Sequence, residues 1–125
     1  MIVIDASVLV DAFIGDVAAA NRISGEELHA PHLIDLEVAS ALRRLESSGA
    51  IAELDAARFL SALRIANLHR HSHRELLGSI WGLRNNLSSY DAAYVALATA
   101  LDAPLVTTDA KLAAAPGLTC AVELI

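Results

Sequence analysis

The stretch Met1-Ile-Val-Ile-Asp-Ala-Ser7 opens the chain and predicts how the rest of it folds. Its β-branched run, Ile2–Ile4, is typical of a short strand that is buried on both faces of a sheet. Asp5 ends this run, and a helix-like pattern begins at Ala6. In open parallel α/β sheets, ligands bind beyond the carboxyl ends of the strands. Asp5 is therefore either a helix cap or the beginning of a functional site.

The composition predicts one globular domain over residues 1–125, located in the cytoplasm. Hydrophobic residues make up 55% of the chain and aromatic residues only 4%, so aliphatic side chains must form the core. No apolar run approaches the roughly 18 residues that a transmembrane helix needs, and no signal peptide is recognisable. Cys120 is the single cysteine, which excludes an internal disulfide and agrees with a reducing compartment. We therefore expect no membrane partner.

The charge is unevenly distributed along the chain. The formal net charge of −6 argues against a nucleic-acid partner. However, residues 58–84 contain five Arg and one Glu, whereas residues 1–57 contain ten acids and three Arg. A bound divalent cation would also offset the charge of an acidic cluster. Net charge therefore weakens a nucleic-acid interpretation without excluding it.

Hydrophobic periodicity predicts strands that alternate with helices. The expected strands cover residues 2–4, 28–30, 68–72, 105–108 and 119–124, and the expected helices cover 8–13, 16–24, 33–48, 53–66, 74–84, 88–101 and 111–115. In the helix over 33–48, the spacing of Leu33, Leu36 and Leu42 predicts the buried side. The alternation indicates an α/β fold with three α/β/α layers and a mostly parallel sheet of about four or five strands.

Asp5 and Asp109 each follow a short apolar strand. If the two strands are neighbours in a parallel sheet, their carboxylates share one crevice. Like charges at short range repel each other and raise each other's pKa, and a divalent cation is the usual remedy. Mg²⁺ and Mn²⁺ prefer carboxylate and water oxygens. Helix capping explains either Asp alone, but the pair favours a metal site.

Two further acids lie on predicted helices. Glu37 either faces the edge of the sheet or is an ordinary solvent-facing acid paired with Arg44 or Ser40. Asp91 comes three residues after Ser88, which is typical of a capping box. The helix that Asp91 opens is the most apolar in the chain and must be central, so its N-terminus points at an important location. The residues alone leave the roles of both acids open.

His69, His71 and His73 alternate along the chain, so in a strand they would face one side together. Three histidines on one face suit a transition metal, but the polar neighbours Arg70 and Ser72 favour a polar edge strand instead. The chain contains no GxGxxG, P-loop or GxSxG pattern, which disfavours dinucleotide, nucleoside triphosphate and α/β-hydrolase sites.

Four segments together carry a resemblance to a known family. They are, in chain order, Ile2-Val-Ile-Asp-Ala-Ser7, Leu36-Glu-Val-Ala39, Leu87-Ser-Ser-Tyr-Asp-Ala-Ala-Tyr-Val-Ala-Leu-Ala98 and Leu105-Val-Thr-Thr-Asp109. With these segments the chain resembles the PIN-domain ribonucleases, and especially the VapC-type toxins of bacterial toxin–antitoxin pairs. The long third segment with a downstream Thr-Thr-Asp is specific, whereas a single strand-ending Asp is not.

The resemblance implies a PIN-like fold and an acidic quartet around Mg²⁺ or Mn²⁺, formed by Asp5, Glu37, Asp91 and Asp109. It places Glu37 on the metal directly or through water. It also implies that Ser7 and Thr107 orient the carboxylates or the water on the metal. Every position of the quartet is occupied by an acid, so we expect an active enzyme.

The implied activity is metal-dependent endonucleolytic hydrolysis of RNA, with 5′-phosphate and 3′-hydroxyl products. We expect Asp5 or Glu37 to accept the proton of the attacking water. Arg84 and the other Arg of residues 58–84 are candidates for phosphate contacts, or else they are solvated helix faces. The implied partners are RNA, a cognate antitoxin whose tail occupies the cleft, and a second copy of the chain in a homodimer.

Two other functions deserve comparison with this one. A receiver-like or phosphatase-like domain would use Asp5 as a phosphoacceptor beside Lys111, but it needs a second acid next to Asp5, where Ala6 stands. A pure binding module would act only by binding a partner protein, without catalysis. The intact quartet favours catalysis over both.

Overall fold

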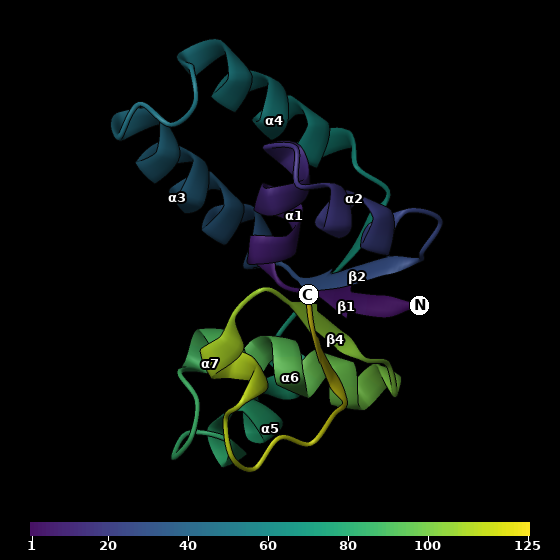
Figure 1. Ribbon diagram of the computed structural model, residues 1–125. Helices are drawn as coiled ribbons and strands as arrows, with labels where there is room; N and C mark the ends of the chain where they lie inside the picture. The colour runs from purple at the N-terminus through teal and green to yellow at the C-terminus, as the bar shows by residue number, and fades with distance from the viewer.

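The computed structural model describes all 125 residues and contains a five-stranded sheet between two layers of helices (Figure 1). The strands are β1 (Ile2–Ile4), β2 (Leu28–Pro31), β3 (Leu68–His71), β4 (Leu105–Thr107) and β5 (Val122–Leu124). All neighbouring strands are parallel, in the order β3-β2-β1-β4-β5. The α/β class and the parallel three-layer architecture predicted from the sequence are confirmed.

The helices divide between the two faces of the sheet, as Figure 1 shows. One face carries α1 (Ala6–Phe13), α2 (Val17–Ile23), α3 (Ile34–Ser47) and α4 (Glu53–Ile65), and the other carries α5 (Leu77–Gly82), α6 (Ser89–Leu101) and α7 (Ala110–Ala113). Helix α6 packs on β1, β2 and β4, and all its residues from Ala92 to Ala98 are buried. None of the helices combines the length and hydrophobicity that a bilayer-spanning segment requires.

The region 74–84 differs from its prediction as a single helix. A 3-10 turn, η1, covers Arg74–Leu76, and α5 follows it and ends at Gly82. Glycine is a poor helix former, because an unfolded glycine has more conformational freedom to lose. Gly78 and Gly82 therefore disfavour a long regular helix here.

Helix α3 has its predicted extent, but its buried side agrees with the prediction only in part, because Leu42 is buried and Leu33 packs against the core while Leu36 does not. Its buried residues are Ile34, Val38 and Leu42, while Leu36 is 74% exposed. Apolar residues occur on most sides of this helix, so several sets of residues satisfy the helical period. Packing against the rest of the core, rather than periodicity, selects the set at i, i+4 and i+8.

The strand order places β1 and β4 where the sheet changes direction. From β1 the chain moves outward through β2 to β3, and it then crosses back to β4 and β5 on the other side of β1. Ile4 lies beside Val106 in parallel register, so the residues that follow these two strands emerge side by side. Such a reversal is where open α/β sheets bind ligands. The topology therefore directs Asp5 and Asp109 to one crevice.

Candidate metal centre

A cleft of about 550 Å³ lies at the carboxyl ends of β1 and β4. Its walls contain all four acids that the sequence analysis selected, which are Asp5, Glu37, Asp91 and Asp109. They come from four different elements: the end of β1, the first turn of α3, the first turn of α6 and the start of α7. The fold thus brings together side chains that are up to 104 residues apart in the sequence.

Asp5 is held by two hydroxyl groups. Ser7 Oγ and Thr107 Oγ1 both donate to Asp5 Oδ2, at 3.0 and 2.7 Å. Although Asp5 occupies the N-cap position of α1, its side chain accepts no hydrogen bond from the helix, so capping does not explain it. Asp5 Oδ1 has no partner within the protein, and no buried side-chain oxygen or nitrogen is left unpaired, so Oδ1 faces solvent in the cleft.

Thr107 also links the two strand-ending acids. Its side chain is fully buried, and its hydroxyl donates to Asp5 and accepts the backbone N–H of Asp109 at 3.0 Å. The Asp109 carboxylate caps α7 by accepting from the backbone N–H groups of Lys111 and Leu112, at 2.8 and 3.3 Å. For Asp109, capping and a position in the cleft therefore occur together rather than as alternatives.

Glu37 and Asp91 lie half-buried in the same cleft. Tyr94 Oη donates to Glu37 Oε1 at 2.8 Å, and no ion pair joins Glu37 to Arg44. Burial and the Glu37 carboxylate raise the pKa of Tyr94 far above its usual value, so its hydroxyl keeps its proton. Ser88 Oγ accepts the backbone N–H of Asp91 at 3.2 Å, as expected for the N-cap of α6.

The carboxylates influence one another electrostatically. Burial raises the pKa of Glu37, and Asp5 and Asp91 add to the rise, although the hydrogen bond from Tyr94 opposes it. Burial also raises the pKa of Asp91, with further increases from Asp5 and Asp109. None of the four acids forms an ion pair with a basic side chain. A set of hard oxygen donors with unbalanced negative charge fits Mg²⁺ or Mn²⁺.

Sequence reasoning missed two charged residues that line the cleft, Asp11 and Arg44. Asp11 lies four residues after Ser7 on α1, and this helical spacing is the signal that was available. Burial and the nearby Asp16 raise the pKa of Asp11. Arg44 lines both this cleft and the adjoining hollow that contains Tyr90.

Arg84, the predicted phosphate contact, is not among the residues that line the cleft. It is exposed after α5, where its guanidinium carbon lies 4.7 Å from the centre of the Trp81 ring. Its Nη1 donates to the Trp81 carbonyl oxygen at 2.9 Å. A cation stacked on an exposed indole presents charge and an apolar surface together.

The predicted row of histidines is assembled differently from the expectation. Strand β3 is an edge strand, as predicted, and His69 and His71 lie on it, whereas His73 lies beyond its end. His29, on β2, pairs in register with His69. Its Nε2 lies 2.9 Å from Glu27 Oε1, and its Nδ1 lies 2.8 Å from His71 Nε2. Sequence reasoning missed Glu27 and His29, because the pairing of β2 with β3 is not readable from either strand.

Comparison with protein families and with curated proteins gives consistent matches. The family model described as PIN domain matches residues 2–118. Ribonuclease VapC1 of Mycobacterium tuberculosis is 50% identical, over 98% of this chain and 96% of its own length. A VapC ribonuclease of Mycobacterium bovis is 42% identical, over 100% of this chain and 98% of its own length.

Solved structures show a related fold at low identity. The crystal structure of PAE2754 from Pyrobaculum aerophilum superimposes with a TM-score of 0.71 at 24% identity, over 98% of this chain and 82% of that one. A chain of a toxin–antitoxin complex from Klebsiella pneumoniae superimposes with a TM-score of 0.72 at 17% identity, over 98% and 96%. Both similarities concern the fold.

Proposed function

Because this chain belongs to the PIN domain family and matches VapC ribonucleases over nearly its whole length, we propose that it is the toxin endoribonuclease of a toxin–antitoxin pair. The observation that carries the proposal is the cleft at the ends of β1 and β4, where four carboxylates from separate elements converge. The proposal treats residues 1–125 as one domain acting in the cytoplasm.

The proposal assigns Asp5, Glu37, Asp91 and Asp109 to the binding of Mg²⁺, with Mn²⁺ as a substitute. When bound, the divalent cation supplies positive charge that lowers the pKa of water and offsets negative charge on the phosphate. Ser7 and Thr107 fix the orientation of Asp5 through its Oδ2, which leaves Oδ1 directed into the cleft. Tyr94 orients Glu37 in the same way.

In the proposed reaction, water attacks the phosphorus of a phosphodiester in RNA. The bond between phosphorus and the 3′-oxygen breaks, and the 3′-oxygen takes a proton from solvent water, which leaves a 3′-hydroxyl on one product and a 5′-phosphate on the other. Asp5 or Glu37 accepts the proton of the attacking water. Both carboxylates are oriented by hydroxyl donors, so each has one oxygen that is not used in those hydrogen bonds.

Two arginines are assigned to the RNA backbone. Arg44 lies beside the carboxylates in the wall of the cleft, where a guanidinium is suited to hold the phosphate next to the cleaved bond. Arg84 stays a proposed contact further along the strand, because the exposed Trp81 ring beneath it offers a stacking surface for a base.

The proposed partners are a cognate antitoxin and a second copy of the chain. An antitoxin segment in the cleft would inhibit the enzyme by covering the carboxylates. The homodimer is supported by large apolar side chains that α4 leaves exposed, namely Leu54, Leu60 and Ile65, at 61%, 43% and 84%. Contiguous exposed apolar surface marks interaction sites, and pairing two copies through α4 would cover these side chains.

Cleavage of RNA by purified protein in Mg²⁺ tests the proposed function. We expect Asp5→Asn and Asp91→Asn each to lower the cleavage rate by about 10²-fold or more, which is the usual loss when a charge-stabilising or proton-accepting group is removed. Asp102→Asn is the matched control. Asp102 is exposed at the opposite end of α6 from Asp91, and its left-handed conformation also suits Asn.

The outcomes separate the parts of the proposal. Equal activity of the wild type and all three variants would contradict the quartet assignment. Activity that persists in excess chelator would contradict the metal requirement. Absence of cleavage by the wild type on total RNA, tRNA and rRNA in either Mg²⁺ or Mn²⁺ would contradict the ribonuclease assignment.

A further inference from the structure

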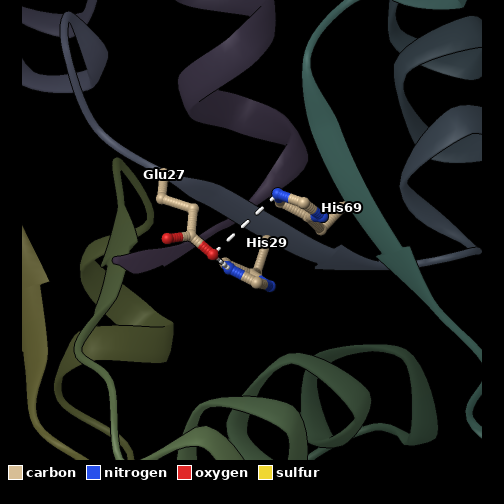
Figure 2. Close-up of side chains that lie close together, drawn as sticks. All are labelled: Glu27, His29 and His69. Atoms are coloured by element: carbon tan, nitrogen blue, oxygen red, sulfur yellow. Dashed lines mark hydrogen bonds and ion pairs between the residues drawn. The ribbon is translucent and has the colours of Figure 1, made fainter.

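A second polar cluster lies toward the opposite ends of the strands from the carboxylate cleft. Glu27 immediately precedes β2, and His29 and His69 are the second residues of β2 and β3. Since the strands are parallel, this cluster lies near their amino ends, whereas the cleft lies at their carboxyl ends. Figure 2 shows the three side chains directed toward one another beside the sheet.

The cluster has the dimensions of a metal site. One ligand atom from each of Glu27, His29 and His69 lies within 4.8 Å of the others, and no other trio of His, Cys, Asp or Glu side chains in the chain is grouped so closely. Glu27 Oε1 is 2.9 Å from His29 Nε2 and 3.9 Å from His69 Nε2. Two ligands of one tetrahedral Zn²⁺ lie about 3.4 Å apart, given bonds of about 2.1 Å.

Rotation of the exposed side chains would complete the geometry, because the His29 and His69 rings are stacked at an interplanar angle of 18° and a metal lies in the plane of each imidazole that binds it. The Glu27 and His69 side chains are 58% and 53% exposed, so both are free to adjust. The His29 side chain is only 8% exposed, and it provides the fixed member of the set. Its ring stacks on the rings of His69 and His71, with centroid distances of 4.7 and 5.1 Å.

The hydrogen bond between His29 and His71 orients the central ligand. A carboxylate only accepts, so His29 Nε2 carries its hydrogen toward Glu27, and the Nδ1 of a neutral ring accepts from His71 Nε2. If the hydrogen of each ring moves to its other nitrogen, this bond survives in the reverse direction and His29 Nε2 is free to bind a metal. Metal-bound histidines commonly have such a partner on their other ring nitrogen.

No basic side chain competes for Glu27. Its only ion-pair partners are the imidazoles of His29 and His69. The adjacent Glu26 takes the nearby cations instead, because it pairs with Arg22 at 2.8 Å and with the amino group of Met1 at 3.4 Å. Glu27 is thus an anionic ligand that no guanidinium or ammonium group of the chain occupies.

We propose that Glu27, His29 and His69 bind a transition-metal ion of the Zn²⁺ class, with water in the fourth position. Two imidazoles and one carboxylate suit Zn²⁺, Co²⁺ or Ni²⁺, whereas Mg²⁺ prefers an all-oxygen site such as the cleft. Bound there, the ion joins the edge strand β3 to β2 by ligands from both strands. This proposal is independent of the ribonuclease proposal, since none of its residues lines the cleft.

Calorimetric titration of the purified protein with Zn²⁺, in excess Mg²⁺ to fill the cleft, tests the proposal. We expect one Zn²⁺ per chain and at least about tenfold weaker binding by Glu27→Gln and His69→Gln. Both substituted side chains are more than half exposed, so the variants are expected to fold, and circular dichroism checks this. His73→Gln is the matched control, because His73 is an exposed histidine outside the cluster.

Co²⁺ provides a second measurement that does not depend on affinity. A four-coordinate site with nitrogen ligands gives intense visible absorption, which an octahedral oxygen site does not, and we expect this absorption to be lost in His69→Gln and kept in Asp91→Asn. Equal Zn²⁺ binding by His69→Gln and the wild type would overturn the proposal. Binding that is lost in Asp91→Asn and kept in His69→Gln would also overturn it, by assigning the ion to the cleft.

Discussion

The carboxylate cleft and the Glu27–His29–His69 cluster place charged groups on the same sheet in opposite ways. The cleft gathers acids that form no ion pair with a basic side chain, and burial raises the pKa values of Glu37 and Asp91, with a further rise from the neighbouring carboxylates. In the histidine cluster, the hydrogen bond from His29 lowers the pKa of Glu27. Like charges therefore meet in the first region, and complementary groups meet in the second.

This difference has a chemical meaning. The cleft is electrostatically incomplete and is balanced by a hard cation from outside, which suits a centre that must also accept a negatively charged phosphate. The histidine cluster is already satisfied by its own hydrogen bonds, so a metal there must displace existing partners and must favour nitrogen ligands. The two regions should thus differ in metal preference and in their response to removal of charge.

The largest expected effect separates the two regions by activity. Asp109→Asn should lower RNA cleavage by about 10²-fold or more, because Asn can still cap α7 but provides no charge for a cation. His69→Gln should leave cleavage unchanged in saturating Mg²⁺. Single-turnover assays of both variants measure this. Equal losses of cleavage activity in the two variants would show that the cleft and the histidine cluster act as one site, and would contradict the difference proposed between them.

A smaller loss is expected when the carboxylates stay and only their support changes. Tyr94→Phe keeps the buried ring and removes the donor to Glu37, and a hydrogen bond to a charged group contributes about 1.5–3 kcal/mol. We expect the free energy of unfolding to fall by about 1–2 kcal/mol, because water in the cleft replaces part of the bond. Cleavage should fall by roughly tenfold, as for the loss of one orienting contact. Urea denaturation and cleavage assays measure the two effects.

Tyr90→Phe is the matched control for this prediction. Tyr90 lies one turn before Tyr94 on α6, but it is 67% exposed and its hydroxyl makes no side-chain hydrogen bond. Its replacement should leave stability unchanged. If Tyr90→Phe lowered stability as much as Tyr94→Phe, the hydrogen bond to Glu37 would not be the cause.

The cleft was more predictable from the sequence than the histidine cluster, and the reason is local chemistry. Asp5 and Asp109 each end an apolar β-branched strand, and the carboxyl ends of parallel strands meet at one edge. Ser88 opens α6 as its N-cap, which fixes where Asp91 stands. Such signals lie within a few residues of each acid. The PIN resemblance then grouped the acids as a set.

Side chains whose roles depend on distant partners were not predictable. Tyr94 meets Glu37 across 57 residues, and His71 meets His29 across 42. No local pattern specifies either pair, because strand order and helix rotation are decided by packing of the whole core. The assignment of Leu36 to the buried side of α3 was wrong for the same reason. Glu27 illustrates the problem best, since nothing beside it in the sequence marks it as different from Glu26.

The electrostatic contrast between the two regions also predicts opposite effects on stability. In chelator at pH 7, Asp91→Asn should raise Tm by a few degrees, because the raised pKa of Asp91 means that its surroundings disfavour its charge despite the helix dipole. Glu27→Gln should lower Tm slightly, since it weakens the bond from His29. Thermal unfolding measures both, with Glu46→Gln, on an exposed residue of α3, as the control. Shifts of the same sign would contradict the electrostatic contrast.

The smallest expected effect is the dependence of those two shifts on pH. The folded-state pKa of Asp91 lies above its ordinary value of 3.8, so its stabilising contribution is present below that pH and is lost as pH rises through the folded-state pKa. Glu27 has a folded-state pKa below its ordinary value of 4.5, so its contribution is present above that pH and is lost on acidification.

As the pH falls from 7 to 4, the difference in Tm between each variant and the wild type should therefore shrink toward zero. Asp91→Asn should approach the wild type from a higher Tm, and Glu27→Gln from a lower Tm. Thermal unfolding of the three proteins in chelator across this range measures the convergence. A Tm difference for Asp91→Asn that stays constant with pH would show that packing, and not the charge on the carboxylate, causes its effect. In that case the fold alone would hold the acids of the cleft together, and no cation would be needed to offset repulsion between their carboxylates.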